Sequence, residues 1–467
     1  MNKKKQNDLI RYALKNIKPF NDKDTIVYAH LIKEPLDKEE MRDSNLLLHF
    51  EIFTERSIQS DNIFFTNHQI ANEDYIPYIY TFSITNEHDN STEELSKFEQ
   101  EILENNGWIK GKISKNSNIG FQGHLSLAFG LVHKEHNNQK LPLELDASFI
   151  PIRMSIGDKY YSKLQETKEI NARILHNIEY NPTEMSNLDS QQSSDNPSTP
   201  YNVKIYKVGA ANTITIEKDD HCILFDCGKR NPPVPSVINK IIDNVKPTII
   251  IISHLHTDHY NLITNINCDK VTHIIVPDLN IIIAKNSSIT NFLVALKKRN
   301  IQIIDLSKIN DYKDLLKTFG YSNIDIFLGT NRGDPGENSP LGHIKYDRSI
   351  DDSGIILSIK SHNSDKRAIF PGDCSYYSWP NEEELNLLNT IKLIVPHHGG
   401  HIISKDMQDT YTGINSTVFL SSNFRALINR NDINGNTNHF TFVQTVLNNP
   451  FIKITANNPN SYFSFKI

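Results

Sequence analysis

The C-terminal part of the chain alternates between short apolar runs and amphipathic segments. The apolar runs have the length and composition of buried strands. They span residues 222–226, 248–252, 273–276, 301–304, 326–328, 354–359, 368–370, 393–395 and 418–420. Between the first two runs, residues 235–245 place apolar side chains at helical spacing, and residues 292–296 and 440–447 predict further helices. This alternation predicts an α/β fold.

The N-terminal part shows a more mixed pattern. Apolar runs at residues 46–53, 75–84 and 126–132 predict strands, and residues 9–17 carry apolar side chains at helical spacing. Residues 92–105 open with a Thr-x-Glu-Glu sequence, which is typical of a capped surface helix. We therefore expect a separate α+β domain here.

A polar stretch separates these two parts. Residues 181–200 are rich in Ser, Asn, Pro and Gln and contain almost no side chain that could be buried. Such a composition is typical of a flexible linker. It predicts an N-terminal domain over residues 1–180, a linker over 181–200 and a larger domain over 201–467.

Charge and cysteine content narrow the possible functions. The chain has 467 residues and a net charge of −6, of which residues 1–200 carry −8 and residues 201–467 carry +2. Neither part is a polybasic nucleic-acid binder. No apolar run approaches the length of a membrane span, and four cysteines without a CxxC pair are no disulfide framework. We expect a cytoplasmic protein that does not bind membranes.

The strongest chemical signal directly follows the apolar run at 248–252. His254, His256, Asp258 and His259 place four metal-competent side chains within six residues. Imidazole and carboxylate groups are suitable ligands for Zn²⁺, Mn²⁺ or Fe. A strand end followed by a loop would let these side chains face two neighbouring ions.

Two further polar clusters follow predicted strands. Gly372-Asp373 comes after the run at 368–370, and His397-His398 comes after the run at 393–395. Because functional side chains in α/β folds gather at strand ends, we expect these groups to lie near the first cluster.

Together, these motifs resemble the metallo-β-lactamase superfamily. The order Asp226-x-Gly228, His254-x-His256-x-Asp258-His259, Gly372-Asp373 and His397 is that of the family, over residues 201–467 only. The doubled His397-His398-Gly399, the run at 351–353 and the late Asn438-His439 are similar to the competence-protein (ComEC-like) branch. The resemblance implies an αββα sandwich with a metal cluster between the edges of its sheets.

The resemblance also implies a role for each matched residue. His254 and His256 would hold one metal; Asp258, His259 and His397 would hold a second; and Asp373 would bridge them. Asp226 would not bind a metal but would hydrogen-bond a ligand histidine and so orient it. Asp258, His398 and His439 would be the catalytic residues, with His398 and His439 on the substrate side. A third-motif histidine is missing, and His343, the nearest candidate, lies 30 residues before Asp373.

Three functions remain open at this point. The first is a metal-dependent phosphodiesterase or nuclease with two divalent ions, Zn²⁺ foremost, acting on a phosphodiester such as a nucleic acid or a nucleotide. The second is a hydrolase of a small carbonyl substrate such as a lactone, thioester or β-lactam. The third is a non-catalytic sensor that binds a partner protein, for which the N-terminal domain would supply the recognition surface.

Overall fold

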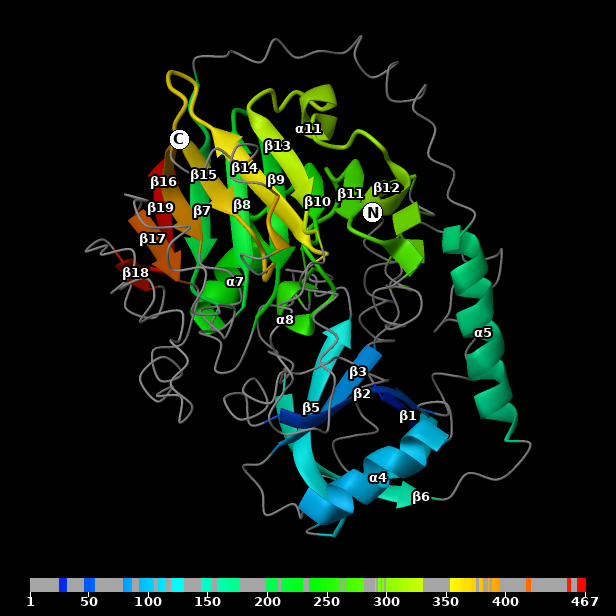
Figure 1. Cartoon of the computed structure of the whole chain (residues 1–467). Helices are drawn as coiled ribbons and strands as arrows, with labels where there is room; N and C mark the ends of the chain where they lie inside the picture. The colour runs from blue at the N-terminus through cyan, green and yellow to red at the C-terminus, as the bar shows by residue number, and fades with distance from the viewer. Residues whose placement is uncertain are drawn as a thin grey trace, which may run out of the picture. The chain divides into compact units, whose positions relative to one another are not determined.

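The computed structural model divides the chain into two compact units (Figure 1). The first contains Met1–Ile178 and Asn280–Asn300, and the second contains Glu179–Leu279 and Ile301–Ile467. The structure describes residues 25–31, 46–54, 79–85, 92–104, 108–114, 117, 119–129, 144–152, 158–176, 199–208, 211–229, 235–260, 262–263, 266–280, 290, 293–294, 296–297, 300–330, 353–374, 378–380, 385, 389–394, 417–420, 452–454 and 460–467.

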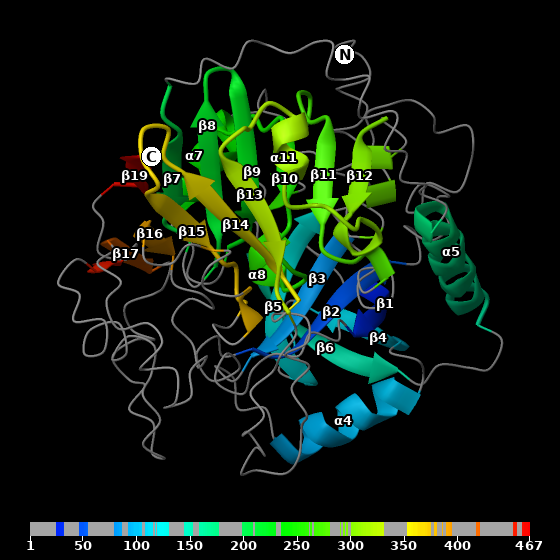
Figure 2. The ribbon, with the colours of Figure 1, turned by 45° about the horizontal axis from the view of Figure 1, so that its top comes forward.

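The first unit is built on a closed antiparallel barrel. Its strands are β1 (Thr25–Leu31), β2 (Leu46–Thr54), β3 (Ile79–Thr85), β4 (Trp108–Ser114), β5 (Phe121–Phe129) and β6 (Glu144–Ile152). They pair in the order β1-β2-β3-β5-β6-β4, and β4 returns to β1 (Figure 2). Closure satisfies the backbone groups that an open sheet would expose at its edges. Alternate residues such as Val27, Ala29 and Leu31 fill the interior.

Two helices accompany this barrel. α4 (Thr92–Glu104) places Leu95, Phe98 and Ile102 at helical spacing, and all three pack into the barrel core. α5 (Lys159–His176) begins after Asp158, whose Oδ1 accepts a hydrogen bond from the backbone N–H of Tyr160 at 3.0 Å. α4 therefore completes the core of the barrel, and Asp158 caps the start of α5.

The second unit begins with a seven-stranded sheet. Its strands are β7 (Asn202–Tyr206), β8 (Thr213–Lys218), β9 (His221–Cys227), β10 (Ile249–Ile251), β11 (His273–Val276), β12 (Gln302–Asp305) and β19 (Tyr462–Lys466). The order is β12-β11-β10-β9-β8-β7-β19, with β9 to β12 mutually parallel. Tyr201 and Ile467 exchange backbone hydrogen bonds of 2.9 and 3.0 Å, which join the first strand of the unit to its last.

A six-stranded sheet forms the second layer. Its strands are β13 (Ile324–Leu328), β14 (Ile355–Lys360), β15 (Arg367–Phe370), β16 (Thr390–Ile394), β17 (Thr417–Leu420) and β18 (Ile452–Ile454), paired in that order. β13 to β15 are antiparallel neighbours, whereas β15 to β18 are parallel.

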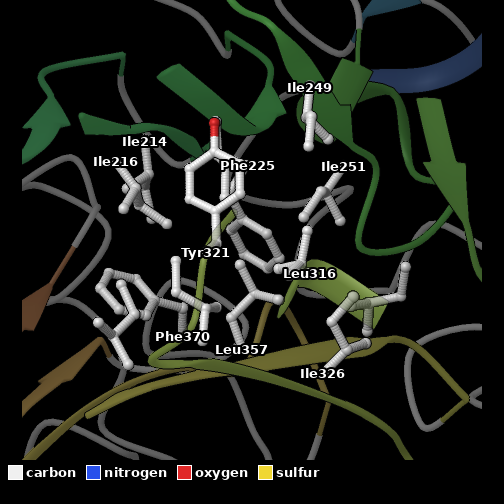
Figure 3. Close-up of a cluster of buried hydrophobic side chains, with 14 of the residues drawn as sticks. Ile214, Ile216, Phe225, Ile249, Ile251, Leu316, Tyr321, Ile326, Leu357 and Phe370 are labelled. Atoms are coloured by element: carbon white, nitrogen blue, oxygen red, sulfur yellow. The ribbon is translucent and has the colours of Figure 1, made fainter. Parts of the chain in front are cut away.

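The core of the second unit lies between the two sheets. Phe225 and Ile251 from the first sheet face Leu357 and Phe370 from the second (Figure 3). The rings of Phe225 and Phe370 meet edge to face, with centroids 6.5 Å apart. Burial of apolar surface on both inner faces holds the layers together. α7 (Pro235–Asn244) buries Val237, Ile238 and Ile241 on one of its faces.

Most of the sequence-predicted elements that lie in the described residues are confirmed. β11 coincides with the predicted run at 273–276, α4 ends one residue before the predicted boundary, and α7 confirms the helix that follows β9. The helices predicted at 9–17 and 440–447 lie outside the described residues. Within the described part of the chain, no helix is long and apolar enough to cross a membrane.

Candidate metal centre

The candidate site lies where strands of both sheets end. β9 and β10 are parallel neighbours, so their carboxyl ends meet at one edge of the first sheet. Asp226 is the last residue but one of β9, and Ser253-His254 follows β10. Asp373 follows β15 of the second sheet. Three chain segments that are far apart in the sequence therefore deliver polar side chains to one place.

The histidine motif folds as a tight turn that leads into a short helix. β10 ends at Ile251, and α8 (Thr257–Tyr260) begins six residues later. The N–H of His259 donates to the carbonyl of His256 at 2.9 Å, which closes the turn. The ring of His254 lies 4.7 Å from that of His256 and 4.0 Å from that of His259, measured between centroids. The turn thus gathers the imidazoles of His256 and His259 around that of His254.

Asp373 reaches this group from the second sheet. One ligand atom each from His254, His256 and Asp373 lies within 4.8 Å of the other two. Oδ1 of Asp373 is 3.1 Å from Nε2 of His259, and Oδ2 is 3.6 Å from Nε2 of His254. All four side chains are buried. The carboxylate therefore lies between His254 and His259.

Asp226 supports the histidines from the opposite side. Its Oδ2 lies 2.7 Å from Nδ1 of His259, and its Oδ1 accepts the N–H of Ser253 at 2.7 Å. Complete burial raises the pKa of the Asp226 carboxyl, and the contacts with His259 and Ser253 oppose that rise. The backbone of Asp226 is left-handed, with φ of +56°. Aspartate is one of the few residues that adopt this conformation readily.

The donor set fits a divalent transition metal. His254, His256 and Asp373 converge as two buried imidazoles and a carboxylate, and His259 lies beside them, 3.1 Å from Asp373. Zn²⁺ prefers such ligands, and Mn²⁺ or Fe²⁺ accept the same groups. The Nδ1 of His259 faces a carboxylate, an arrangement typical of metal-ligating histidines. The residues that the structure describes can therefore hold at least one such ion.

Several predicted site residues are not placed. The backbone of Asp258 lies in α8, but its side chain is outside the described part of the structure. His397, His398, His439 and His343 are likewise outside the described residues. The roles of Asp258 and His397 as ligands of a second metal, and of the substrate-side histidines, stay predictions.

Sequence reasoning gave no role to Ser253, although it directly precedes the histidine motif. Its hydroxyl donates to Oδ2 of Asp226 at 2.8 Å and lies 3.0 Å from Nδ1 of His254. The available signal was its position between a buried strand and the first histidine. A serine there is not informative until the fold brings Asp226 beside it.

Three solved structures show weak overall likeness to this chain. Igni18, a novel metallo hydrolase from the hyperthermophilic archaeon Ignicoccus hospitalis KIN4/I, is 17% identical with a TM-score of 0.35, over 57% of this chain and 99% of Igni18. YhfI, a metallo-β-lactamase fold protein from Bacillus subtilis, is 14% identical with a TM-score of 0.32, over 57% of this chain and 99% of YhfI.

A mutant of the β-hydroxylase CmlA is 9% identical with a TM-score of 0.29, over 74% of this chain and 69% of CmlA. A scan against protein-family models finds no match, and a search of curated proteins finds none either. All three TM-scores lie below 0.5, so any function must be argued from the residues of this chain.

Proposed function

We propose that this chain is a metal-dependent hydrolase and that its substrate is a phosphodiester. The observation that carries the proposal is the buried convergence of His254, His256, His259 and Asp373 at the ends of strands from two sheets. A structural metal site is closed by four ligands, whereas the predicted set, with Asp258 and His397 added, has enough donors for two ions with open positions.

The residues of the chain have distinct tasks in this proposal. Bound divalent ions would lower the pKa of a water molecule and neutralise negative charge on a phosphoryl group. His254, His256, His259 and Asp373 would hold the ions, and Asp226 keeps His259 oriented. His398 or His439 would give a proton to the leaving oxygen as its bond to phosphorus breaks.

Charge and motif pattern favour phosphodiesters over carbonyl substrates. The second unit carries doubled histidines, His397-His398, and lacks a third-motif histidine close before Asp373. The net charge of +2 over residues 201–467 gives no extended basic track for duplex DNA. A small or single-stranded phosphodiester therefore suits the site best.

Metal content per chain is the first test. We expect wild-type protein, purified without chelator and analysed for elements, to contain about two metal ions per chain, as a two-metal site requires. His256→Ala and Asp373→Ala should both lower this number. His221→Gln is the matched control, because it removes a histidine from the opposite end of β9. Wild-type protein that holds no metal, even after incubation with Zn²⁺ or Mn²⁺, would overturn the proposal and favour a partner-binding role.

A substrate panel then separates the hydrolase classes. The metal-loaded protein would be assayed with bis(p-nitrophenyl) phosphate, a short single-stranded oligonucleotide, a lactone, a thioester and a β-lactam. Hydrolysis of the first two alone supports the proposal. Hydrolysis of only the carbonyl substrates would leave the metal site intact but contradict the phosphodiester assignment.

A further inference from the structure

Ser253 lies where the described segments of the candidate metal centre meet. Its side chain is fully buried. Its hydroxyl lies 2.8 Å from Oδ2 of Asp226, 3.0 Å from Nδ1 of His254 and 3.3 Å from Nδ1 of His259. A serine hydroxyl has one hydrogen to donate and two lone pairs that accept. The positions of Asp226, His254 and His259 therefore decide which neighbour accepts the hydroxyl hydrogen and which ring nitrogens donate to Oγ.

The hydrogen of Ser253 goes to Asp226. A buried carboxylate only accepts hydrogen bonds, and a bond between a hydroxyl and a charged oxygen is stronger than one to a neutral imidazole nitrogen. Turning the hydroxyl toward His254 instead would leave lone pairs of Ser253 and Asp226 facing each other at 2.8 Å. The Oγ atom of Ser253 is then an acceptor for the histidines.

This choice fixes the tautomer of His254. Nδ1 of His259 lies closer to Oδ2 of Asp226, at 2.7 Å, than to the hydroxyl of Ser253, so its proton goes directly to the carboxylate. Nδ1 of His254 has the hydroxyl as its acceptor, at 3.0 Å. With a proton on Nδ1 in both rings, Nε2 is the nitrogen of each ring that faces Asp373 and can bind an ion there. One carboxylate thus orients two histidines, one directly and one through Ser253.

The packing around Ser253 fixes the hydroxyl in this place. Gly372 has φ of +58°, and a Cβ added to it would lie 2.7 Å from Oγ and 2.8 Å from Cβ of Ser253. The carbonyl of Ser253 also accepts the N–H of Ile355, at the start of β14, at 2.8 Å. The loop that carries Asp373 and the second sheet are therefore both built against Ser253.

We propose that Ser253 is a positioning residue that holds His254 in the Nδ1–H tautomer, so that its Nε2 can bind metal beside Asp373. The proposal rests on the proposed metal-dependent function. It concerns a residue that takes no part in holding the ion itself. Because ligand-orienting partners typically contribute 10–100-fold to metal affinity, loss of the hydroxyl should be measurable.

Protonation of the ring nitrogens can be observed in the metal-free full-length protein. Histidine labelled with ¹⁵N in the ring gives distinct shifts for protonated and unprotonated Nδ1, and His254→Gln and His259→Gln assign the two signals. We expect Nδ1 to be protonated in both His254 and His259 at about pH 8. An unprotonated Nδ1 with a protonated Nε2 in wild-type His254 overturns the proposal without any serine variant.

Ser253→Ala separates the two histidines. The variant should release His254 to a mixture of tautomers, whereas His259 should keep its Nδ1 proton because it bonds Asp226 directly. Its Zn²⁺ affinity, measured by competition with a chromogenic chelator, should fall about 10–100-fold. Ser358→Ala is the matched control, because it removes a fully buried hydroxyl that bonds Arg367 at 3.0 Å in the same unit.

The outcomes distinguish this proposal from the proposed function. Unchanged His254 tautomer and unchanged Zn²⁺ affinity in Ser253→Ala would overturn the role of Ser253 while leaving a metal hydrolase intact. Wild-type protein that binds no metal but shows both Nδ1 protons would contradict the hydrolase and keep the tautomer assignment. Loss of affinity that Ser358→Ala reproduces would mean a general loss of stability and would count against a positioning role.

Discussion

Oδ2 of Asp226 lies 2.7 Å from Nδ1 of His259, and both side chains are fully buried. The two residues belong to different segments, the end of β9 and the short helix α8. Nε2 of His259 lies 3.1 Å from Oδ1 of Asp373. The imidazole of His259 therefore connects the carboxylate of Asp226 with that of Asp373, a candidate metal ligand. The sequence separation of 33 residues is bridged because β9 and β10 are parallel neighbours.

This relationship predicts that Asp226→Asn lowers metal affinity without unfolding the protein. Asparagine adopts left-handed backbone at least as readily as aspartate, so the φ of +56° is tolerated. The amide loses the charge that fixes His259, and we expect Zn²⁺ affinity to fall about 10–100-fold. Chelator competition measures the affinity, and circular dichroism checks the fold.

Asp325→Asn provides the matched control for this change. Asp325 is also buried and accepts a charge-assisted hydrogen bond, from Arg367 at 2.8 Å, but it lies on β13. Its substitution should lower stability and leave Zn²⁺ affinity unchanged. Equal affinity in wild type and Asp226→Asn would show that His259 is oriented without the carboxylate charge.

The sequence allowed much of this site to be predicted, because its members follow strands that are strongly apolar. Asp226, His254 and Asp373 could each be placed at a strand end from the local pattern alone. Ser253 could not be assigned a role, because its partners come from residues 27 positions before it and one position after it. Such a network depends on strand pairing, which the local pattern does not encode.

Gly372→Ala should destabilise the second unit through both backbone strain and a steric clash. Its φ of +58° costs an alanine about 1–3 kcal/mol, and the contact with Ser253 at 2.7–2.8 Å adds a similar amount. We expect the free energy of unfolding to fall by about 2–6 kcal/mol, measured by denaturant titration with Trp379 fluorescence in a Trp108→Phe background.

Gly320→Ala isolates the backbone part of this effect. Gly320 has φ of +89°, but a Cβ added there meets no atom within 4 Å. Its substitution should cost only about 1–3 kcal/mol, from the left-handed backbone alone. If both variants lose the same stability, the close approach of Gly372 to Ser253 contributes nothing.

The closure of the N-terminal barrel shows where prediction from sequence stops. Several of its strands are recognisable from their apolar runs, and α4 from its cap. Closure depends on the pairing of β1 with β4, which brings Tyr28 opposite Lys110 across 82 residues. No local pattern specifies that register, so the sequence supported only an α+β assignment.

Asp158→Ala should destabilise this first unit by removing three interactions at once, one of which is an ion pair with Lys110 at 3.3 Å. The Oδ2 atom of Asp158 accepts the buried hydroxyl of Tyr28 at 2.8 Å, and its Oδ1 caps α5 through the N–H of Tyr160. Burial raises the pKa of Tyr28 to about 12 against the opposing effect of Lys110, so the hydroxyl keeps its proton, and its buried O–H needs an acceptor. Loss of the cap and of that acceptor should cost about 2–4 kcal/mol.

Trp108 fluorescence in a Trp379→Phe background reports this unit alone, because Trp108 lies on β4. Asp146→Ala is the matched control. Its carboxylate also forms an ion pair, with His124 at 2.9 Å, but the side chain of Asp146 is 83% exposed. Exposed pairs contribute about 0–1 kcal/mol, so a loss in Asp158→Ala that is no larger than in Asp146→Ala would refute the capping role.

His273 should make the second unit less stable as the pH falls. Burial lowers its pKa from 6.5 to about 4, and a hydrogen bond with Gln302 opposes that shift. Above pH 6.5 the ring is neutral in both states, so its contribution to stability is complete. Between pH 6.5 and 4 the unfolded chain takes up a proton that the folded ring resists, and up to about 3 kcal/mol is lost. Denaturant titrations with and without His273→Gln, both in a Trp108→Phe background and followed by Trp379 fluorescence, should show a shallower pH dependence in the variant. Identical slopes would mean that the folded protein accommodates a charged His273 despite its contact with Phe319 at 4.2 Å between ring centroids.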